Sequence, residues 1–264
     1  MSGGQRRAEV GYEECEVPGV GVLWRSWGDA APQLLPADGA ADLILRDETT
    51  LIAGPSTRAF TATGGEHSVT VGLRFLPGTA GSALGVHPGE FRDRHVPAAD
   101  ALGSELLRRG EVLLSRLREA ELVQRGGMAP HASAAAAMFA ERAGNSRWAA
   151  LARATAARGG STSELARELG YSERQAHRRM YEHFGYGFAT LRRVLRAERA
   201  QALLRAGLSA VDTATRAGYS DQAHLSREFR DLVGATPTGY LADLAYATGV
   251  SDSPGASGAA GSAA

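Results

Sequence analysis

Residues 165–172 read Leu-Ala-Arg-Glu-Leu-Gly-Tyr-Ser, and residues 213–220 read Thr-Ala-Thr-Arg-Ala-Gly-Tyr-Ser. In each stretch an alanine stands four residues before the glycine, and a charged amphipathic segment follows the serine. Glycine lets the chain turn sharply after a short helix, and the small alanine lets a second helix cross close to the first. Two copies of this pattern predict two helix-turn-helix units.

The residues after each turn indicate where the second helix of each unit begins. Ser172 is suited to be an N-cap because its hydroxyl can accept a backbone N–H, and Gln175 stands at the capping-box position three residues later. In the second unit, Ser220 or Asp221 plays the equivalent part, and the sequence leaves the choice between them open.

The register between the two units follows from their core positions. The tripeptide Gln-Ala-His occurs in both copies, but it is not the correct guide to the alignment. The apolar pair Ala176 and Met180, spaced i,i+4, must match the pair Leu225 and Phe229. The second unit is therefore one residue longer between its turn and its core.

In this register Arg178 matches Arg227, and each arginine stands beside a core position on a helix that follows a turn. A long helix is expected to join the two units, with one apolar side and one basic side. The apolar side carries Leu191, Leu195 and Leu203, and the basic side carries Arg192, Arg196 and Arg199. For most of these three arginines a solvated surface is favoured over phosphate contact.

The stretch that contains both units resembles the DNA-binding domain of AraC-type transcription regulators. The resemblance covers about 80 of the 264 residues. Its most distinctive part is Gly-Tyr-Ser-Asp-Gln-x-His-x-Ser-Arg-x-Phe at residues 218–229, followed by Gly234-x-Thr236-Pro237-x-x-Tyr240. The resemblance implies that each unit offers a recognition helix to one of two successive major-groove segments on one face of the duplex.

Carried over position by position, the resemblance implies two sets of DNA contacts. Arginine can donate two hydrogen bonds to guanine, and glutamine can pair with adenine. The base-reading candidates are Arg174, His177 and Arg178 in the first unit, and Gln222, Ala223, Ser226 and Arg227 in the second. The phosphate-contact candidates, all near helix starts, are Thr162, Ser172 and Ser209. This sequence departs from the family at two positions: Ala176 replaces a usual leucine, and Ala223 leaves only a contact with a thymine methyl.

The N-terminal half has the pattern of a β domain. In residues 68–75, Val69, Val71, Leu73 and Phe75 fall on one face of an expected strand, and residues 20–25, 42–45 and 51–53 are further strand candidates. Turn signals such as Asp38-Gly39 separate these runs, which predicts a small β-sandwich or barrel. The patterns at residues 38–46, 53–55, 71–78, 84–86 and 92–94 are similar to those of a cupin-like domain of poorly defined role attached to some AraC-type regulators.

Several kinds of chemical site are disfavoured. His67, His87 and His95 stand singly, and no His-x-His pair is present to begin a cupin metal site. Cys15 is the single cysteine, so the chain has no internal disulfide, and no Gly-x-Ser-x-Gly motif indicates a serine nucleophile. We therefore expect no cofactor, no metal and no enzyme activity. Arg46 and Arg74 are expected to pair with Asp38 and Asp42, an interpretation favoured over an anionic-ligand pocket.

Charge supports the same division of the chain. The totals cancel at 29 arginines and 29 acidic residues, but residues 1–130 hold 13 arginines against 17 acids, and residues 131–264 hold 16 against 12. A basic C-terminal half is consistent with a nucleic-acid partner, although a solvated helical surface explains it about as well. No apolar stretch approaches the roughly 18 residues needed to cross a bilayer, and the N-terminus lacks a signal-peptide pattern.

These observations together predict an α+β multidomain protein. Its parts are a cupin-like β-sandwich or barrel (1–98), a helical connector (99–157), an all-α double helix-turn-helix domain (158–246) and a disordered tail (247–264). The expected function is cytoplasmic, sequence-specific regulation of transcription on double-stranded DNA, modulated by a small-molecule effector at the N-terminal domain. RNA polymerase is a partner that the family resemblance implies. The leucines between residues 102 and 117 are expected either to form a homodimer interface or to cover the β domain.

Two alternatives stay open. One is a small-molecule enzyme of the cupin type fused to a helix-turn-helix scaffold. The other is a protein-interaction module built on the same paired scaffold.

Overall fold

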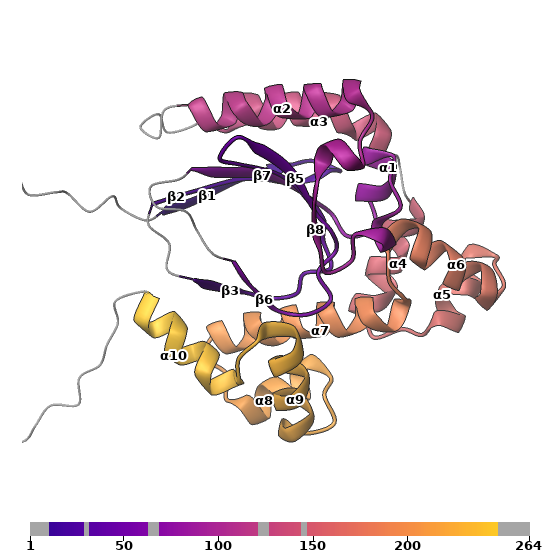
Figure 1. Cartoon of the computed structure of the whole chain (residues 1–264). Helices are drawn as coiled ribbons and strands as arrows, with labels where there is room; N and C mark the ends of the chain where they lie inside the picture. The colour runs from indigo at the N-terminus through magenta and orange to yellow at the C-terminus, as the bar shows by residue number, and fades with distance from the viewer. Residues whose placement is uncertain (1–10, 29–31, 63–68, 121–126, 144–146, 248–264) are drawn as a thin grey trace, which may run out of the picture.

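The computed structural model describes residues 11–28, 32–62, 69–120, 127–143 and 147–247. Its N-terminal part is built on one antiparallel sheet in the order β1-β2-β7-β4-β5-β8, and a separate antiparallel pair, β3 with β6, lies apart from it (Figure 1). The strands are β1 (Gly11–Val17), β2 (Gly21–Trp27), β3 (Gln33–Leu35), β4 (Asp42–Arg46), β5 (Thr49–Ala53), β6 (Phe60–Ala62), β7 (Thr70–Phe75) and β8 (His95–Pro97).

The core of this part follows from the alternation along β7. Val71, Leu73 and Phe75 are fully buried, as the period of two predicted, and Leu73 pairs with Leu23 of β2 on one side and Leu43 of β4 on the other. The α+β class is confirmed. A closed barrel is wrong, because β1 and β8 are the two unpaired edges of the sheet in the described part of the chain. Ser68, where the strand was expected to begin, lies outside the described residues.

Helices cover one face of the sheet. They are α1 (Ala80–Leu84), α2 (Ser104–Glu119) and α3 (Ala129–Ala143), with short 3-10 turns at Pro88–Glu90 and Ala98–Asp100. Leu106, Leu113, Leu114 and Leu117 of α2 are buried in the same core as the sheet. These leucines therefore cover the β structure, which was one of their two predicted roles. We refer to the two sheets with α1–α3 as the β-domain.

One buried charge fastens α2 to the sheet. Arg25 of β2 is only 2% exposed, although its place beside Trp24 in the strand did not predict that the arginine is buried. Its guanidinium donates to the carbonyl of Ala120, 2.6 Å away at the end of α2, and pairs with Glu13 at 2.7 Å. A cation is favourable at the carbonyl end of a helix, where unpaired backbone acceptors gather.

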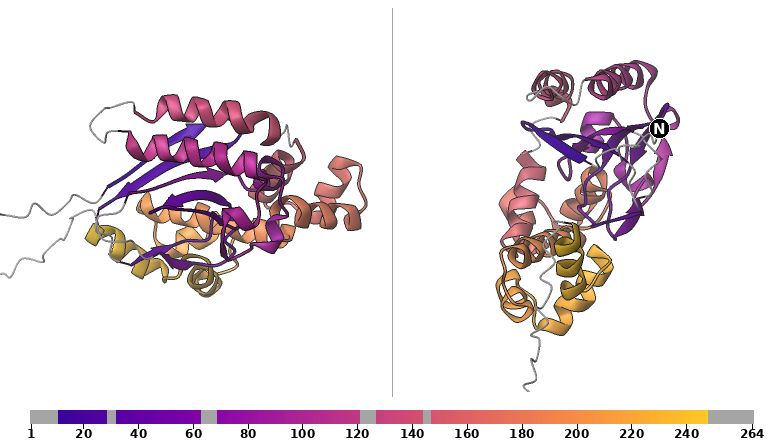
Figure 2. Two further views of the ribbon diagram at one scale, coloured as in Figure 1. Left: turned by 45° about the horizontal axis from the view of Figure 1, so that its top comes forward. Right: turned by 90° about the vertical axis from the view of Figure 1, so that its left-hand side faces the viewer.

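The rest of the chain is helical. Its helices are α4 (Arg147–Ala157), α5 (Thr162–Leu169), α6 (Glu173–Phe184), α7 (Phe188–Arg205), α8 (Ala210–Ala217), α9 (Gln222–Val233) and α10 (Pro237–Ala247). The long α7 runs between two helix pairs, α5 with α6 and α8 with α9, and it passes below the β-domain on the side away from α2 and α3 (Figures 1 and 2). No helix in the described ranges combines the length and apolar character of a membrane span.

The β-domain also contacts the helical part of the chain directly, at the end of α9 and just before α7. The backbone N–H of Ala37 donates to the carbonyl of Leu232 over 2.7 Å, and that of Ala59 donates to Asp231 over 3.2 Å. Both acceptors are in the last turn of α9, where helical carbonyls lack intrahelical partners. The buried hydroxyl of Tyr186, just before α7, donates to the carbonyl of Gly39 at 2.9 Å. The β-domain thus holds both the start of α7 and the end of α9.

Candidate nucleic-acid interface

The first helix pair has the local features of a helix-turn-helix unit. Ser161 and Glu164 form a capping box at the start of α5, and Gly170 ends that helix with a left-handed φ of 69°. Glycine takes this left-handed conformation without the steric penalty of a Cβ, so it favours the turn. Ser172 and Gln175 form the predicted capping box of α6, with the Gln175 N–H donating to the Ser172 hydroxyl.

The outer surface of α6 carries all three base-reading candidates of this unit. Arg174, His177 and Arg178 are exposed, and the Arg178 side chain is 72% exposed while its Nε lies 3.4 Å from a carboxylate oxygen of Glu182. Tyr181 is also exposed, and its ring lies 4.9 Å from that of His177. Tyr181 was not predicted, although its i,i+3 spacing from Arg178 was a signal for it.

The second helix pair repeats the arrangement. Ser209 caps α8, and Gly218 ends it with a φ of 86°. Asp221, and not Ser220, caps α9, because its carboxylate accepts the backbone N–H of His224 at 2.6 Å. Of the base-reading candidates on α9, Gln222, Ala223 and Arg227 are exposed, whereas Ser226 is partly covered.

The burial pattern confirms the register that places these surfaces. Ala176, Met180, Leu225 and Phe229 are all fully buried, and each pair fills the inner side of its own helix. The matched arginines, Arg178 and Arg227, both point away from these cores. The two units therefore present one arginine each at the same position of a helix that begins directly after a turn.

The phosphate-contact candidates are at helix starts, as predicted. Ser172 and Ser209 are N-caps, so their hydroxyls already accept the backbone N–H of Gln175 and Asp212. Thr162 is the first residue of α5 and is partly exposed beside the cap Ser161. All three positions are next to helix N-termini, where the positive end of the helix dipole favours an anion.

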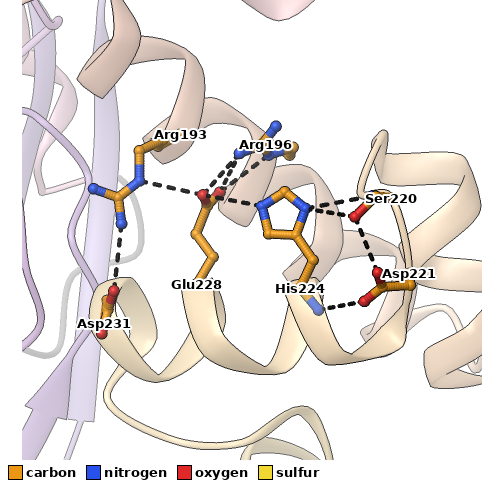
Figure 3. Close-up of polar contacts among 7 residues, drawn as sticks. All are labelled: Arg193, Arg196, Ser220, Asp221, His224, Glu228 and Asp231. Carbon is orange, nitrogen blue, oxygen red and sulfur yellow. Dashed lines mark hydrogen bonds and ion pairs between the residues drawn. The ribbon is translucent and has the colours of Figure 1, made fainter.

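A buried acid joins α9 to α7, and this contact was not predicted from the sequence. Glu228 is 7% exposed, and its carboxylate lies 2.7 Å from the Arg196 guanidinium and 3.2 Å from Nε of Arg193 (Figure 3). The imidazole of His224 is 3.8 Å away on the same helix, and its other nitrogen lies 3.1 Å from the Ser220 hydroxyl. The i,i+3 spacing of Glu228 from Leu225 was the one signal that it faces inward.

This cluster changes the interpretation of Arg196. Its side chain is 20% exposed, and its guanidinium also lies 4.7 Å from the centre of the Tyr219 ring. Arg196 therefore holds the second unit onto α7, and the prediction of a solvated surface is wrong for this residue. Arg199 is exposed and Arg192 is partly exposed, in agreement with that prediction.

A cavity of about 440 Å³ lies between the β-domain and α7. Arg74 lines it and pairs with Asp38 at 3.1 Å and with Asp42 at 3.2 Å, which confirms the predicted pairing for Arg74 but not for Arg46. Burial raises the pKa of Asp42 to about 6 although Arg74 acts to lower it. Within the described ranges, no group of three or more His, Cys, Asp or Glu side chains is arranged as metal ligands.

Comparison with known proteins separates the same two parts. Residues 165–243 match a family model described as a helix-turn-helix domain, and residues 18–97 match the model of a domain of unknown function. No curated protein matches the chain.

Among solved structures, ToxT from Vibrio cholerae is similar with 11% identity over 87% of this chain and 97% of that chain, at a TM-score of 0.42. An unsaturated fatty acid-bound wild-type ToxT from Vibrio cholerae strain SCE256 has 10% identity over 88% and 91%, at a TM-score of 0.40. These values are too low to assign a ligand or a function.

Proposed function

We propose that the chain is a DNA-binding transcription regulator of the AraC type, in which α6 and α9, within the helix-turn-helix match at residues 165–243, read bases in two successive major-groove segments. The observation that carries the proposal is the matched pair Arg178 and Arg227. Both are exposed on capped helices that follow a glycine turn, and both stand beside a buried core pair that fixes their direction.

The chemistry of the two exposed surfaces differs. On α6, two arginines and a histidine offer hydrogen-bond donors suited to guanine O6 and N7. On α9, Gln222 offers both a donor and an acceptor, which suits adenine, and Ala223 offers only a methyl group. Ser226 and Arg227 complete the second set, and Thr162, Ser172 and Ser209 are proposed to contact phosphates. The first unit is thus expected to prefer guanine, and the second a mixed sequence.

The β-domain is proposed to modulate DNA binding. Its backbone donors hold the end of α9, and its loop at Gly39 accepts from Tyr186 before α7. A change in these contacts would alter the relative placement of the two recognition helices, and the cavity beside α7 gives a small-molecule effector a place to act. The domain limits 1–98, 99–157, 158–246 and 247–264, homodimerisation, contact with RNA polymerase and a cytoplasmic location stay predictions.

Selection of bound sites from random double-stranded DNA tests the proposal. The expected result is a bipartite motif whose halves are about one helical turn, ~10 bp, apart. Arg178→Ala is expected to erase the preference in one half, and Arg227→Ala in the other. Failure to enrich any motif would contradict the proposal.

A salt titration separates DNA recognition from the protein-interaction alternative. Neutralising several phosphates releases counterions, so the logarithm of the association constant should fall linearly with the logarithm of salt concentration. A slope of several units is expected on the selected site, and a slope near zero would favour the alternative.

A further inference from the structure

The cavity between the β-domain and α7 has the size of a small-molecule site. Its volume of about 440 Å³ is within the range of roughly 300–1,000 Å³ found for ligand pockets. The apolar part of its wall is formed by Leu35, Ala40, Ala53 and Phe60. Its polar lining side chains come from both the β-domain and α7. The cavity therefore spans the two parts of the molecule.

The inner lining holds more acid than base. Arg74 is shared by two carboxylates, those of Asp38 and Asp42. Glu198 of α7 is a third carboxylate, and it forms no hydrogen bond or ion pair with any residue that the structure describes. Burial and the nearby Asp38 raise the pKa of Glu198 to about 7, although Arg74 acts to lower it.

The cations at the edge of the cavity do not offset this excess. Arg58 and Arg94 also line the cavity, but both residues are exposed to solvent. His95 is exposed as well, and partial burial together with Arg46 lowers its pKa, which keeps it neutral at neutral pH. An anionic ligand would therefore lie beside the Glu198 carboxylate, and the one arginine of the interior, Arg74, already pairs with Asp38 and Asp42.

A second observation points to a ligand. Gln201 lies one helical turn after Glu198 on α7, lines the same cavity, and is only 7% exposed. Its side-chain amide forms no hydrogen bond with any described residue and is not among the fully enclosed unpaired polar atoms, so it is open to the cavity. An amide in such a place normally finds a hydrogen-bond partner, which here a ligand in the cavity can supply. An amide and a carboxylate thus face one cavity from adjacent turns, and neither has a partner.

We propose that this cavity binds a small organic cation, a primary ammonium group on an apolar body, with Glu198 and Asp38 as its carboxylate acceptors and the Gln201 amide oxygen as a third acceptor. An ammonium group has three donors and no acceptor, which matches these three oxygens. The apolar body packs against Leu35 and Phe60.

Binding of such a cation would act on the second recognition helix through α7. Glu198 and Gln201 line the cavity, while Arg193 and Arg196 of the same helix hold Glu228 of α9. On the other side of the cavity, Ala37 is next to Asp38 and donates to the end of α9. A cation that joins Asp38 to Glu198 fixes α7 and α9 against the β-domain. This consequence for DNA binding rests on the proposed function.

Three probes with the same body and different head groups test the assignment on the full-length protein without DNA. They are phenethylamine, which is cationic at pH 7.5, neutral 2-phenylethanol and anionic 3-phenylpropionate. Calorimetric titration is expected to give the ammonium probe at least tenfold tighter binding than the other two. Glu198→Gln should weaken it at least tenfold, Gln201→Leu should weaken it severalfold, and Glu90→Gln, at an exposed position outside the cavity, should leave it unchanged.

Three results would overturn the assignment: equal or tighter binding of 3-phenylpropionate, unchanged binding of phenethylamine to Glu198→Gln, or no binding of any probe. Glu198→Gln removes a charge that burial disfavours, so a folding defect is not expected to confuse the result. The DNA-site selection is a separate readout. If the selection yields no motif while phenethylamine binds as expected, the proposed function fails and the cavity assignment stands. If a motif is recovered but phenethylamine does not bind as expected, the cavity assignment alone is overturned.

Discussion

Arg178 and Arg227 have the same position in their two units, so their substitutions should have similar effects. Each change to alanine is expected to weaken binding to the selected operator by about 1–3 kcal/mol, the range for loss of one bidentate base contact. Fluorescence anisotropy on labelled operator and on scrambled DNA measures this loss. Arg109→Ala removes the same charge from an exposed position on α2 and should change neither affinity. An equal loss on both DNAs would instead indicate a phosphate contact.

Glu228 is the residue on which the attachment of α9 to α7 depends most. Glu228→Gln leaves Arg193 and Arg196 without their shared carboxylate, and Arg196 is largely covered. Breaking a buried pair costs about 3–5 kcal/mol, and the partial exposure of Arg193 reduces the expected loss of unfolding free energy to about 2–3 kcal/mol.

Urea denaturation followed by circular dichroism measures this loss. The matched control is Glu105→Gln, which breaks the exposed pair with Arg108 on α2 and should cost less than about 1 kcal/mol. Equal losses for the two variants would show that burial of the Glu228 cluster adds nothing to stability.

One ion pair was predicted from the sequence because its acids and its arginine all fall in the expected β domain. Arg74 was expected to pair with Asp38 and Asp42, and it does. Arg25 and Glu228 were not predicted, because nothing in the sequence indicated that the end of α2 packs against Arg25 or that the basic side of α7 packs against Glu228. A charged residue beside a core position is compatible with solvent or with burial until the neighbouring element is known.

At the scale of elements, the cap of α6 has two roles that one substitution can separate. Ser172→Ala removes the side-chain acceptor of the cap and should lower the unfolding free energy by about 0.5–2 kcal/mol. Ser172→Asp keeps a good N-cap, so its stability should stay close to that of the wild type. Its added negative charge should repel the phosphate proposed to lie there, so operator affinity should fall.

Thermal unfolding and operator binding are measured for both Ser172 variants. Ser104→Asp, at the exposed start of α2 in the β-domain, adds the same charge at a position with no proposed DNA contact and is the control. Full operator affinity in Ser172→Asp would remove Ser172 from the phosphate-contact set.

The helical elements were more predictable than the strands. Gly170 and Gly218 both take the left-handed conformation that the turn pattern required. These turns were predictable because the glycine, the alanine before it and the helix cap after it are all within one short stretch of sequence. β2, β4, β5 and β7 were expected from their apolar runs. β1, β3, β6 and β8 were not predicted, since they are short or alternate with charged residues. Such segments become strands only through pairing with a partner elsewhere in the chain.

At the scale of the whole molecule, the sequence separated the two halves but did not show how they touch. The contact uses backbone groups of Ala37, Gly39 and Ala59, which carry no residue-specific signal. Its position explains why a cavity forms there. The strand pair β3–β6 reaches α7 and α9, and the space between it and the main sheet is lined by acids from both halves.

Those acids make the stability of the whole molecule depend on pH. Glu198 ionises with an ordinary pKa of 4.5 in the unfolded chain and with a pKa of about 7 in the folded protein. The folded state therefore binds more protons between these values, so its stability falls as pH rises from about 4.5 to about 7 and is then constant. Asp42, whose pKa is raised to about 6, contributes in the same direction.

Glu198→Gln removes the larger of these two contributions while keeping the shape of the side chain. Relative to the wild type, its unfolding free energy should be nearly unchanged at pH 4 and higher by about 1–3 kcal/mol at pH 8, a value reduced for partial solvent screening. Urea denaturation across pH 4–8 measures both curves, and Glu90→Gln should follow the wild type throughout. Curves for Glu198→Gln and wild type that stay parallel from pH 4 to pH 8 would mean that Asp38, Asp42 and Arg74 leave Glu198 with an ordinary affinity for protons.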